Sequence, residues 1–237
     1  MIPLRDNAGA PRLCPINLML IAANVAVFIY EASLGAGADT LIARYGMIPA
    51  RVAAIGSTSP PAALQALLTL LTAMFIHAGV LHLAGNMLFL FIFGPAVEMR
   101  LGHRNYLYFY LAAGVAAGLA MVFIDPTARV PVIGASGAIA AVLGAYFILY
   151  PRARILTLLP FFFIIELVEV PAVVYLLLWF GWQLLSALQS HAFANMAGGV
   201  AWWAHIGGFM FGLAAAPWLA RKQKPARRRV TVGKAVR

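Results

Sequence analysis

Four polar residues in otherwise apolar segments of this 237-residue chain have side chains that could act together in catalysis. Ser136 lies in the tetrapeptide Gly-Ala-Ser-Gly, and a serine hydroxyl becomes a nucleophile when a nearby imidazole such as that of His205 accepts its proton. His82 and Asn86 are four residues apart, so they would share one face of a helix. Both side chains can donate hydrogen bonds to the oxyanion that forms when a carbonyl group is attacked. The four residues therefore predict a site for acyl transfer, with Ser136 as nucleophile and His205 as general base.

Each of these residues alone also has a purely structural explanation. A serine in a membrane helix commonly bonds back to its own backbone or packs against a neighbour, and a lone buried histidine is more often structural than catalytic. Small residues follow each member of the predicted pair on one helix face: Ala140 and Gly144 after Ser136, and Gly208 and Gly212 after His205. Small residues at this spacing let two helix backbones approach closely. The pattern favours a hydrogen-bonded serine and histidine.

The composition indicates that the segments carrying these side chains are membrane spans. Hydrophobic residues make up 63% of the chain and charged residues only 10%, whereas a water-soluble domain carries roughly 25% charged residues. A spanning helix needs about 20 mainly apolar residues. Five stretches meet this criterion, namely 16–34, 78–99, 105–124, 131–150 and 197–220. The first is expected to remain as a span, because no small-residue cleavage site precedes it.

The stretch 155–190 is too long for one straight span and too short for two spans with a turn. If 171–190 crosses the membrane and 155–170 lies at its interface, the chain has six spans and both termini are cytoplasmic. All but three of the 17 Lys and Arg residues, namely Arg44, Arg51 and Arg129, then lie on the cytoplasmic side. This is the asymmetry of the positive-inside rule, and a seventh span would place the basic tail outside. We therefore predict an all-α polytopic membrane protein, a six-transmembrane-helix bundle.

In this topology the second, fourth and sixth spans run from outside to inside. Ser136, His205, His82 and Asn86 then lie about 6–12 Å below the outer ends of their spans, at 1.5 Å per residue. Polar side chains gathered at one depth imply a water-accessible cavity that opens outward.

Other classes of protein fit the sequence less well. The net charge of +10 follows from topology and the basic tail adjoins a span, so it favours contact with the lipid bilayer and no nucleic-acid partner. No HExxH motif occurs and His82 and His205 lack an obvious third ligand, so we expect no metal and no other cofactor. A transporter would place its polar site near the midplane of an inverted repeat. Here the site is in the outer third, and no repeat is visible.

Three segments resemble the rhomboid intramembrane proteases, in that family's order: His77 to Asn86 (HAGVLHLAGN), Gly134 to Gly137 (GASG), and Ala204 to Gly208 (AHIGG) followed by Gly212. A fourth, Glu98-Met99-Arg100, is similar to the family's Glu-x-Arg signature. The resemblance extends from about residue 65 to 215, and the first span fits by topology only.

The resemblance implies that Ser136 attacks the scissile carbonyl and that His205 accepts its proton. It implies that His82, Asn86 and the backbone N–H of Ser136 stabilise the oxyanion. The structural residues that it implies are Gly134, Gly137, Gly208, Gly212, Glu98 and Arg100, the last two hydrogen-bonding near the segment between the first two spans, with an interfacial ion pair as the alternative. It also implies that the span 171–190 is a mobile wall through which substrate enters, although its Trp179 and Trp182 are equally expected as lipid-facing anchors.

The sequence thus predicts a serine endopeptidase that cleaves membrane protein substrates in or next to their transmembrane helices. We expect a cytoplasmic N-terminus at 1–15, a protease domain at 16–220, a disordered basic tail at 221–237 and a location in the bacterial inner membrane. The alternative is a non-catalytic rhomboid-like protein that binds transmembrane segments, but such proteins typically lose the serine or the histidine. No oligomeric state is predicted. Where some members carry a tyrosine that packs on the histidine, this chain has Ala140, so the sequence does not identify what orients His205.

Overall fold

The computed structural model describes residues 1–10, 14–161, 164–192 and 201–221, and in this part the chain is mostly helical. The α-helices are α1 (Pro15–Ser33), α2 (Ala38–Tyr45), α3 (Pro49–Ala53), α4 (Pro60–Thr72), α5 (Val80–Leu101), α6 (His103–Ile124), α7 (Ser136–Leu149), α8 (Ala172–Ala192) and α9 (Trp202–Arg221). Short 3-10 helices are η1 (Gly35–Gly37), η2 (Ile55–Ser57) and η3 (Ala73–Phe75). The strands are β1 (Ile2–Asp6), β2 (Arg154–Phe161) and β3 (Ile164–Pro171). Nearly all of the predicted basic tail, from residue 222 on, lies outside the described residues.

Each of the six predicted spans overlaps a helix over most of its length, and these helices are α1, α5, α6, α7, α8 and α9. Within the described residues four helices are long and apolar enough to cross a membrane: Pro15–Ser33, Val80–Leu101, His103–Ile124 and Ala172–Gln189. The chain is therefore an integral membrane protein with a helical bundle, while the count of six spans and the side of the termini stay predictions.

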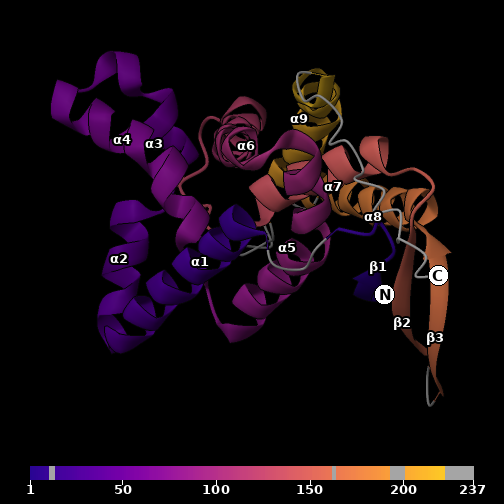
Figure 1. Ribbon diagram of the computed structural model, residues 1–237. Coiled ribbons are helices and arrows are strands. Elements are labelled where there is room, and N and C mark those ends of the chain that lie inside the picture. Colours follow the sequence, from indigo (N-terminus) through magenta and orange to yellow (C-terminus); the bar gives the residue numbers. More distant parts are fainter. Residues whose placement is uncertain (11–13, 162–163, 193–200, 222–237) are drawn as a thin grey trace, which may run out of the picture.

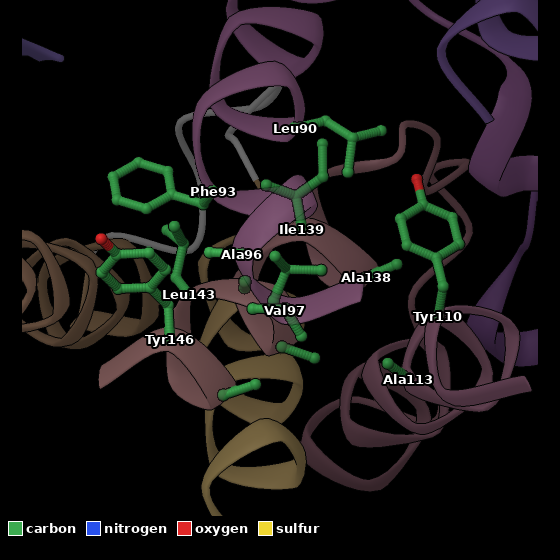
Figure 2. Packing of buried hydrophobic residues seen from close by; sticks show 14 of the residues in the cluster. Leu90, Phe93, Ala96, Val97, Tyr110, Ala113, Ala138, Ile139, Leu143 and Tyr146 are labelled. Atoms are coloured by element: carbon green, nitrogen blue, oxygen red, sulfur yellow. The ribbon is translucent and has the colours of Figure 1, made fainter. Parts of the chain in front are cut away.

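The helix α7 is the centre of the bundle. Figure 1 shows it between α5, α6, α8 and α9, with α2 to α4 on one flank and the strands on the opposite flank. All ten residues from Gly137 to Tyr146 are buried, which explains why α7 is apolar on every face. In Figure 2 the side chains of Ile139 and Tyr146 point toward α5, and the rings of Tyr146 and Phe93 meet edge to face at 5.1 Å. A central helix enclosed in this way holds its first residue, Ser136, in a fixed place.

The helix α7 begins five residues later than the predicted span 131–150. The residues before it form an extended connection, in which Val132 pairs with Met47 in an isolated antiparallel bridge. Gly134 follows with a φ of 113°, a conformation that strongly favours glycine. Because this turn ends at Ala135, Ser136 is the first residue of the helix.

The segment 155–170 is expected at the membrane interface, and its described residues, 155–161 and 164–170, belong to the antiparallel pair of β2 and β3. Strand β1 adds to β2, with Ile2 opposite Leu158 and Asp6 opposite Ile155. The phenol of Tyr146 donates a hydrogen bond of 2.7 Å to Asp6 and so ties this sheet to α7. Strand β3 continues directly into α8. The sheet is an addition to the helical bundle that the sequence did not predict.

Candidate active site

The structure brings Ser136 and His205 into direct contact. His205 lies in the first turn of α9, and its Nε2 atom is 2.8 Å from the Oγ atom of Ser136 at the start of α7. The histidine is buried and the serine half-buried. This is the distance at which an imidazole can accept the proton of a serine hydroxyl.

The small residues of α7 and α9 allow this approach. A β-carbon on Gly144 would lie 2.2 Å from the carbonyl oxygen of Phe209, and a β-carbon on Gly212 would lie 2.0 Å from that of Ala141. Real side chains do not tolerate such distances, so the two backbones touch along the faces that the sequence pattern predicted.

His82 and Asn86, both on α5, lie against the turn that leads into Ser136. A β-carbon on Gly134 would be 2.8 Å from ring atoms of His82 and 3.6 Å from Nδ2 of Asn86. One open cavity of about 810 Å³ is lined by His82, Asn86, Ser136 and His205. The Nδ2 group of Asn86 is buried and has no hydrogen-bond partner among the described residues, so it is a donor available to a bound group.

The backbone at the start of α7 offers further donors. The first intrahelical bond of α7 runs from the N–H of Ile139 to the carbonyl of Ala135. The N–H groups of Ser136, Gly137 and Ala138 precede this ladder, as the first N–H groups of every helix do. They carry the partial positive charge of the helix N-terminus, which favours an anion at this position.

Gln183 of α8 is a further polar residue in contact with His205. Its Oε1 atom is 2.7 Å from Nδ1 of His205, and its side chain is buried. The ring of Trp179 lies tilted 6.2 Å from the imidazole, and the ring of Trp202 meets it edge to face at 6.0 Å. Sequence reasoning missed Gln183. An amide inside an apolar span signals that it needs a hydrogen-bond partner, but Gln189 in the same predicted span gives the same signal.

The two tryptophans of α8 that sequence analysis singled out face different surroundings. Trp179 packs on both His205 and Phe209. Trp182 is 63% exposed, as a lipid-facing anchor would be. The two residues differ in this way because α8 has one face on α9 and one on the outside of the bundle, while the mobile wall implied by the resemblance stays a prediction.

A second, small cavity of about 30 Å³ lies behind Ser136. Its lining is dominated by small and flexible residues, including Ala73, Met74, Gly114 and Gly118. It has room for about one water molecule or a group of similar size.

His77 lies just before α5 and is buried. Its backbone N–H donates a hydrogen bond of 3.1 Å to Glu31, and its ring meets that of His82 edge to face at 5.0 Å. Burial, and after it the neighbouring His82, lower the pKa of His77 to about 4, so His77 is neutral at pH 7. The described residues contain no group of three or more His, Cys, Asp or Glu side chains that could hold a metal ion.

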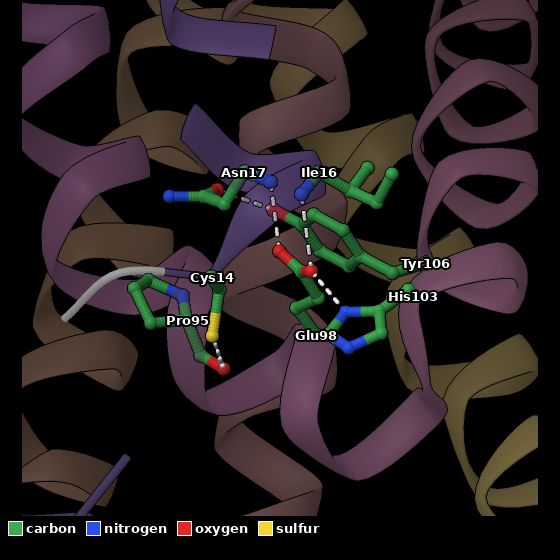
Figure 3. A network of polar contacts seen from close by, with 7 residues as sticks. All are labelled: Cys14, Ile16, Asn17, Pro95, Glu98, His103 and Tyr106. Atoms are coloured by element: carbon green, nitrogen blue, oxygen red, sulfur yellow. Dashed lines mark hydrogen bonds and ion pairs between the residues drawn. The ribbon is translucent and has the colours of Figure 1, made fainter. Parts of the chain in front are cut away.

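Glu98, near the C-terminal end of α5, contacts the start of α1 and not the segment between the first two spans, where the resemblance implied its hydrogen bonds. Its carboxylate accepts hydrogen bonds from the backbone N–H groups of Ile16 (3.1 Å) and Asn17 (2.7 Å) and contacts the ring of His103, as Figure 3 shows. The physical reason is that α1 has no side-chain cap of its own, so its first N–H groups need an acceptor. Arg100 is exposed.

The same junction includes Cys14, whose thiol donates a weak hydrogen bond to the carbonyl of Pro95. Burial, and after it the Glu98 carboxylate, raise the pKa of the Cys14 thiol. A buried thiol of raised pKa forms little of the reactive thiolate, which fits a packing role for Cys14.

Comparison with known proteins links this arrangement to one family. Residues 64–222 match the family model described as Rhomboid domain. The rhomboid protease GluP of Bacillus subtilis is 45% identical over 76 residues, which are 32% of this chain and 14% of GluP. The putative rhomboid protease YdcA of the same organism is 38% identical over 77 residues, which are 32% of this chain and 38% of YdcA.

A longer match is to the mitochondrial presenilin-associated rhomboid-like protein A of Danio rerio, 30% identical over 164 residues. It covers 66% of this chain and 38% of that protein. The chain thus spans well under two thirds of the length of these relatives. Because the Rhomboid domain match covers more than half of its 237 residues, the chain belongs to the rhomboid family.

Proposed function

We propose that this protein is an intramembrane serine endopeptidase that hydrolyses peptide bonds in or next to the transmembrane helices of membrane protein substrates. The observation that carries the proposal is the 2.8 Å contact between Nε2 of His205 and Oγ of Ser136 at the edge of a large open cavity. Family membership supports it, since relatives are named as rhomboid proteases.

In the first half of the reaction Oγ of Ser136 attacks the scissile carbonyl carbon while its proton passes to Nε2 of His205. The C–N bond then breaks, and the leaving nitrogen takes that proton from Nε2. In the second half a water molecule attacks the acyl-enzyme and gives its proton to Nε2. The proton returns to Oγ of Ser136 as the acid product leaves, so the dyad is regenerated without any cofactor.

The oxyanion of each tetrahedral intermediate forms beside the turn at Gly134. His82, Asn86 and the backbone N–H of Ser136 stabilise it, the first two from α5 and the third from α7. The buried Nδ2 group of Asn86, which has no partner in the described part of the chain, supports this role. A donor that has no partner before the reaction and bonds to the oxyanion stabilises the transition state more than the ground state.

A substrate helix must unwind locally before its backbone carbonyl can reach Ser136, because an intact helix has all its carbonyl groups bonded internally. Helix-weakening residues near the cut favour this step. The cavity of about 30 Å³ behind Ser136 suits a small side chain at the cut. We place the entry of the substrate at α8, whose outer face carries exposed Leu177, Leu178 and Leu185.

We assign residues 16–220 to the protease domain, with residues 1–15 and the basic tail 221–237 on the cytoplasmic side of a bacterial cell membrane. The Rhomboid match over 64–222, the bacterial relatives and the distribution of Lys and Arg support this assignment. Fractionation of a bacterial host that expresses the protein should place it in the inner membrane, and recovery in another fraction would contradict the location.

The experiment that tests the function uses purified protein in liposomes with a single-span substrate. Wild type and Ser33→Ala, a change at an exposed serine, should produce the same two fragments, with one cut in or beside the span as determined by mass spectrometry. Ser136→Ala and His205→Ala should produce none. Binding of the substrate without cleavage by any of the four proteins would instead support the non-catalytic, rhomboid-like alternative and overturn the proposal.

A further inference from the structure

We infer that Gln183 is a positioning residue that holds His205 in the tautomer and orientation required of the general base. This inference rests on the proposed protease function and adds a third residue, from a third helix, to the pair Ser136 and His205. The underlying contact is the 2.7 Å distance from Oε1 of Gln183 to Nδ1 of His205.

The placement of Gln183 within α8 sets it apart from its neighbours. Trp182, Leu184 and Leu185 are 63%, 39% and 51% exposed, whereas Gln183 is 5% exposed and faces α9. An amide inside an apolar span is unfavourable unless it is hydrogen-bonded. The hydrogen bond described for the Gln183 side chain is the one to His205, so the buried amide has a partner at this position.

The chemistry of the contact fixes the position of the imidazole proton. Oε1 of Gln183 is an acceptor only, so Nδ1 of His205 must carry the hydrogen. The lone pair of the neutral ring is then on Nε2, which faces Oγ of Ser136. With the amide reversed, its NH₂ group would donate to Nδ1 and leave the proton on Nε2, where it would block proton transfer from the serine.

The amide takes the place of two groups that could otherwise orient the imidazole, a carboxylate and an aromatic ring. Among the described residues no carboxylate is bonded to Nδ1 of His205, and Ala140 has no ring that could pack on the imidazole. A neutral amide orients the ring without a buried negative charge, whose desolvation is unfavourable. Its oxygen still points its partial negative charge at the imidazolium that forms during the reaction.

The contact joins two helices, so it depends on how α8 lies against α9. Phe180 and Phe209 stack at 4.7 Å beside it, and Trp179 bridges Phe209 and the imidazole. These rings hold the backbone of α8 at the distance that the hydrogen bond requires. Alignment of the base is therefore tied to the packing of the α8 wall.

The test compares kcat and KM for Gln183→Met, Gln183→Glu and the matched control Gln189→Met in liposomes. Gln189 is an exposed glutamine on the same helix. Methionine keeps the length of the side chain but removes the strong acceptor. We expect Gln183→Met to lower kcat by about 10- to 100-fold with KM within about twofold of wild type, and Gln189→Met to change neither.

Gln183→Glu distinguishes a positioning role from a merely structural one, because only a positioning role predicts a change in the pH profile. Its carboxylate accepts the same hydrogen bond, so activity should be recovered relative to Gln183→Met. Its negative charge stabilises the imidazolium, so the acidic limb of the pH profile of kcat/KM should move to higher pH than in wild type. Gln183→Glu with the kcat of Gln183→Met and an unmoved pH profile would overturn the inference.

The inference is also overturned if Gln183→Met has the kcat of Gln189→Met, or if it raises KM and leaves kcat unchanged. These results are distinct from failure of the proposed function. In that case wild type itself would show no cleavage that Ser136→Ala abolishes, whereas failure of the inference leaves the wild-type cleavage and its dependence on Ser136 intact.

Discussion

Gly208 of α9 passes the carbonyl oxygen of Gly137 on α7 so closely that a β-carbon on Gly208 would lie 2.0 Å from that oxygen. Gly137 follows Ser136, and Gly208 is three residues after His205, so this contact lies directly beneath the reactive pair. Two backbones in contact leave no room for the helices to move closer or rotate. The distance between the serine hydroxyl and the imidazole is therefore set by glycine packing one turn away.

Gly208→Ala should separate α7 from α9 and weaken both folding and catalysis. A methyl group that meets a backbone oxygen cannot be accommodated by a side-chain rotation, so we expect a loss of about 1–3 kcal/mol in stability. The melting temperature in detergent and kcat in liposomes measure the two effects. The matched control is Gly181→Ala on α8, where a β-carbon would meet nothing within 4 Å. An equal response of the two variants would contradict this account of the helix contact.

Asn86→Ala should lower kcat by about 100- to 1000-fold and leave KM nearly unchanged, because a donor to the oxyanion acts mainly in the transition state. Asn105→Ala is the control, since Asn105 on α6 bonds to the carbonyl of Leu101 and does not line the large cavity. Steady-state kinetics on one substrate measures both. A normal kcat in Asn86→Ala would remove Asn86 from the proposed oxyanion site.

Glu98→Gln should destabilise the bundle by about 1.5–3 kcal/mol, the value of a hydrogen bond to a charged group. The amide can accept only one of the two backbone N–H groups that the carboxylate now accepts, and its own NH₂ group would face the other. Glu169→Gln, at an exposed position on β3, is the matched control and should melt as wild type does. If both variants melt alike, Glu98 is not the cap of α1.

The topology predicts opposite accessibility for two exposed positions. In a Cys14→Ala background, Ser57→Cys lies in the predicted external segment, and Leu167→Cys lies on β3 at the predicted cytoplasmic end. A membrane-impermeant maleimide applied to intact cells should label Ser57→Cys, and should label Leu167→Cys only after permeabilisation. The reverse pattern would show that the positive-inside assignment of the spans is wrong.

Hydropathy located the helices well, because a span must satisfy its backbone internally and so shows as a continuous apolar stretch. The predicted span 78–99 corresponds to α5 at Val80–Leu101, and 105–124 to α6 at His103–Ile124. The start of α7 was predicted too early, because an extended connection with a bridge from Val132 to Met47 is as apolar as a helix. Composition cannot distinguish the two.

The sheet and Gln183 could not be derived from local patterns. Ile2 pairs with Leu158, and no property of either segment indicates so distant a partner. Ser136 and His205 were found because each is embedded in a spaced set of small residues. Gln183 shares its predicted span with Gln189 and no spaced set of small residues singles it out, so only the structure shows that it faces His205 and not lipid or solvent.

The most direct test of the central claim is labelling of Ser136 by a fluorophosphonate probe in detergent-purified protein, with the site identified by peptide mass spectrometry. Such a probe reacts with a serine hydroxyl that a neighbouring base activates. We predict one adduct per chain, on Ser136, in wild type and Ser33→Ala, and none in Ser136→Ala or His205→Ala. Equal labelling of wild type and His205→Ala, or an adduct on another serine, would contradict activation of Ser136 by His205.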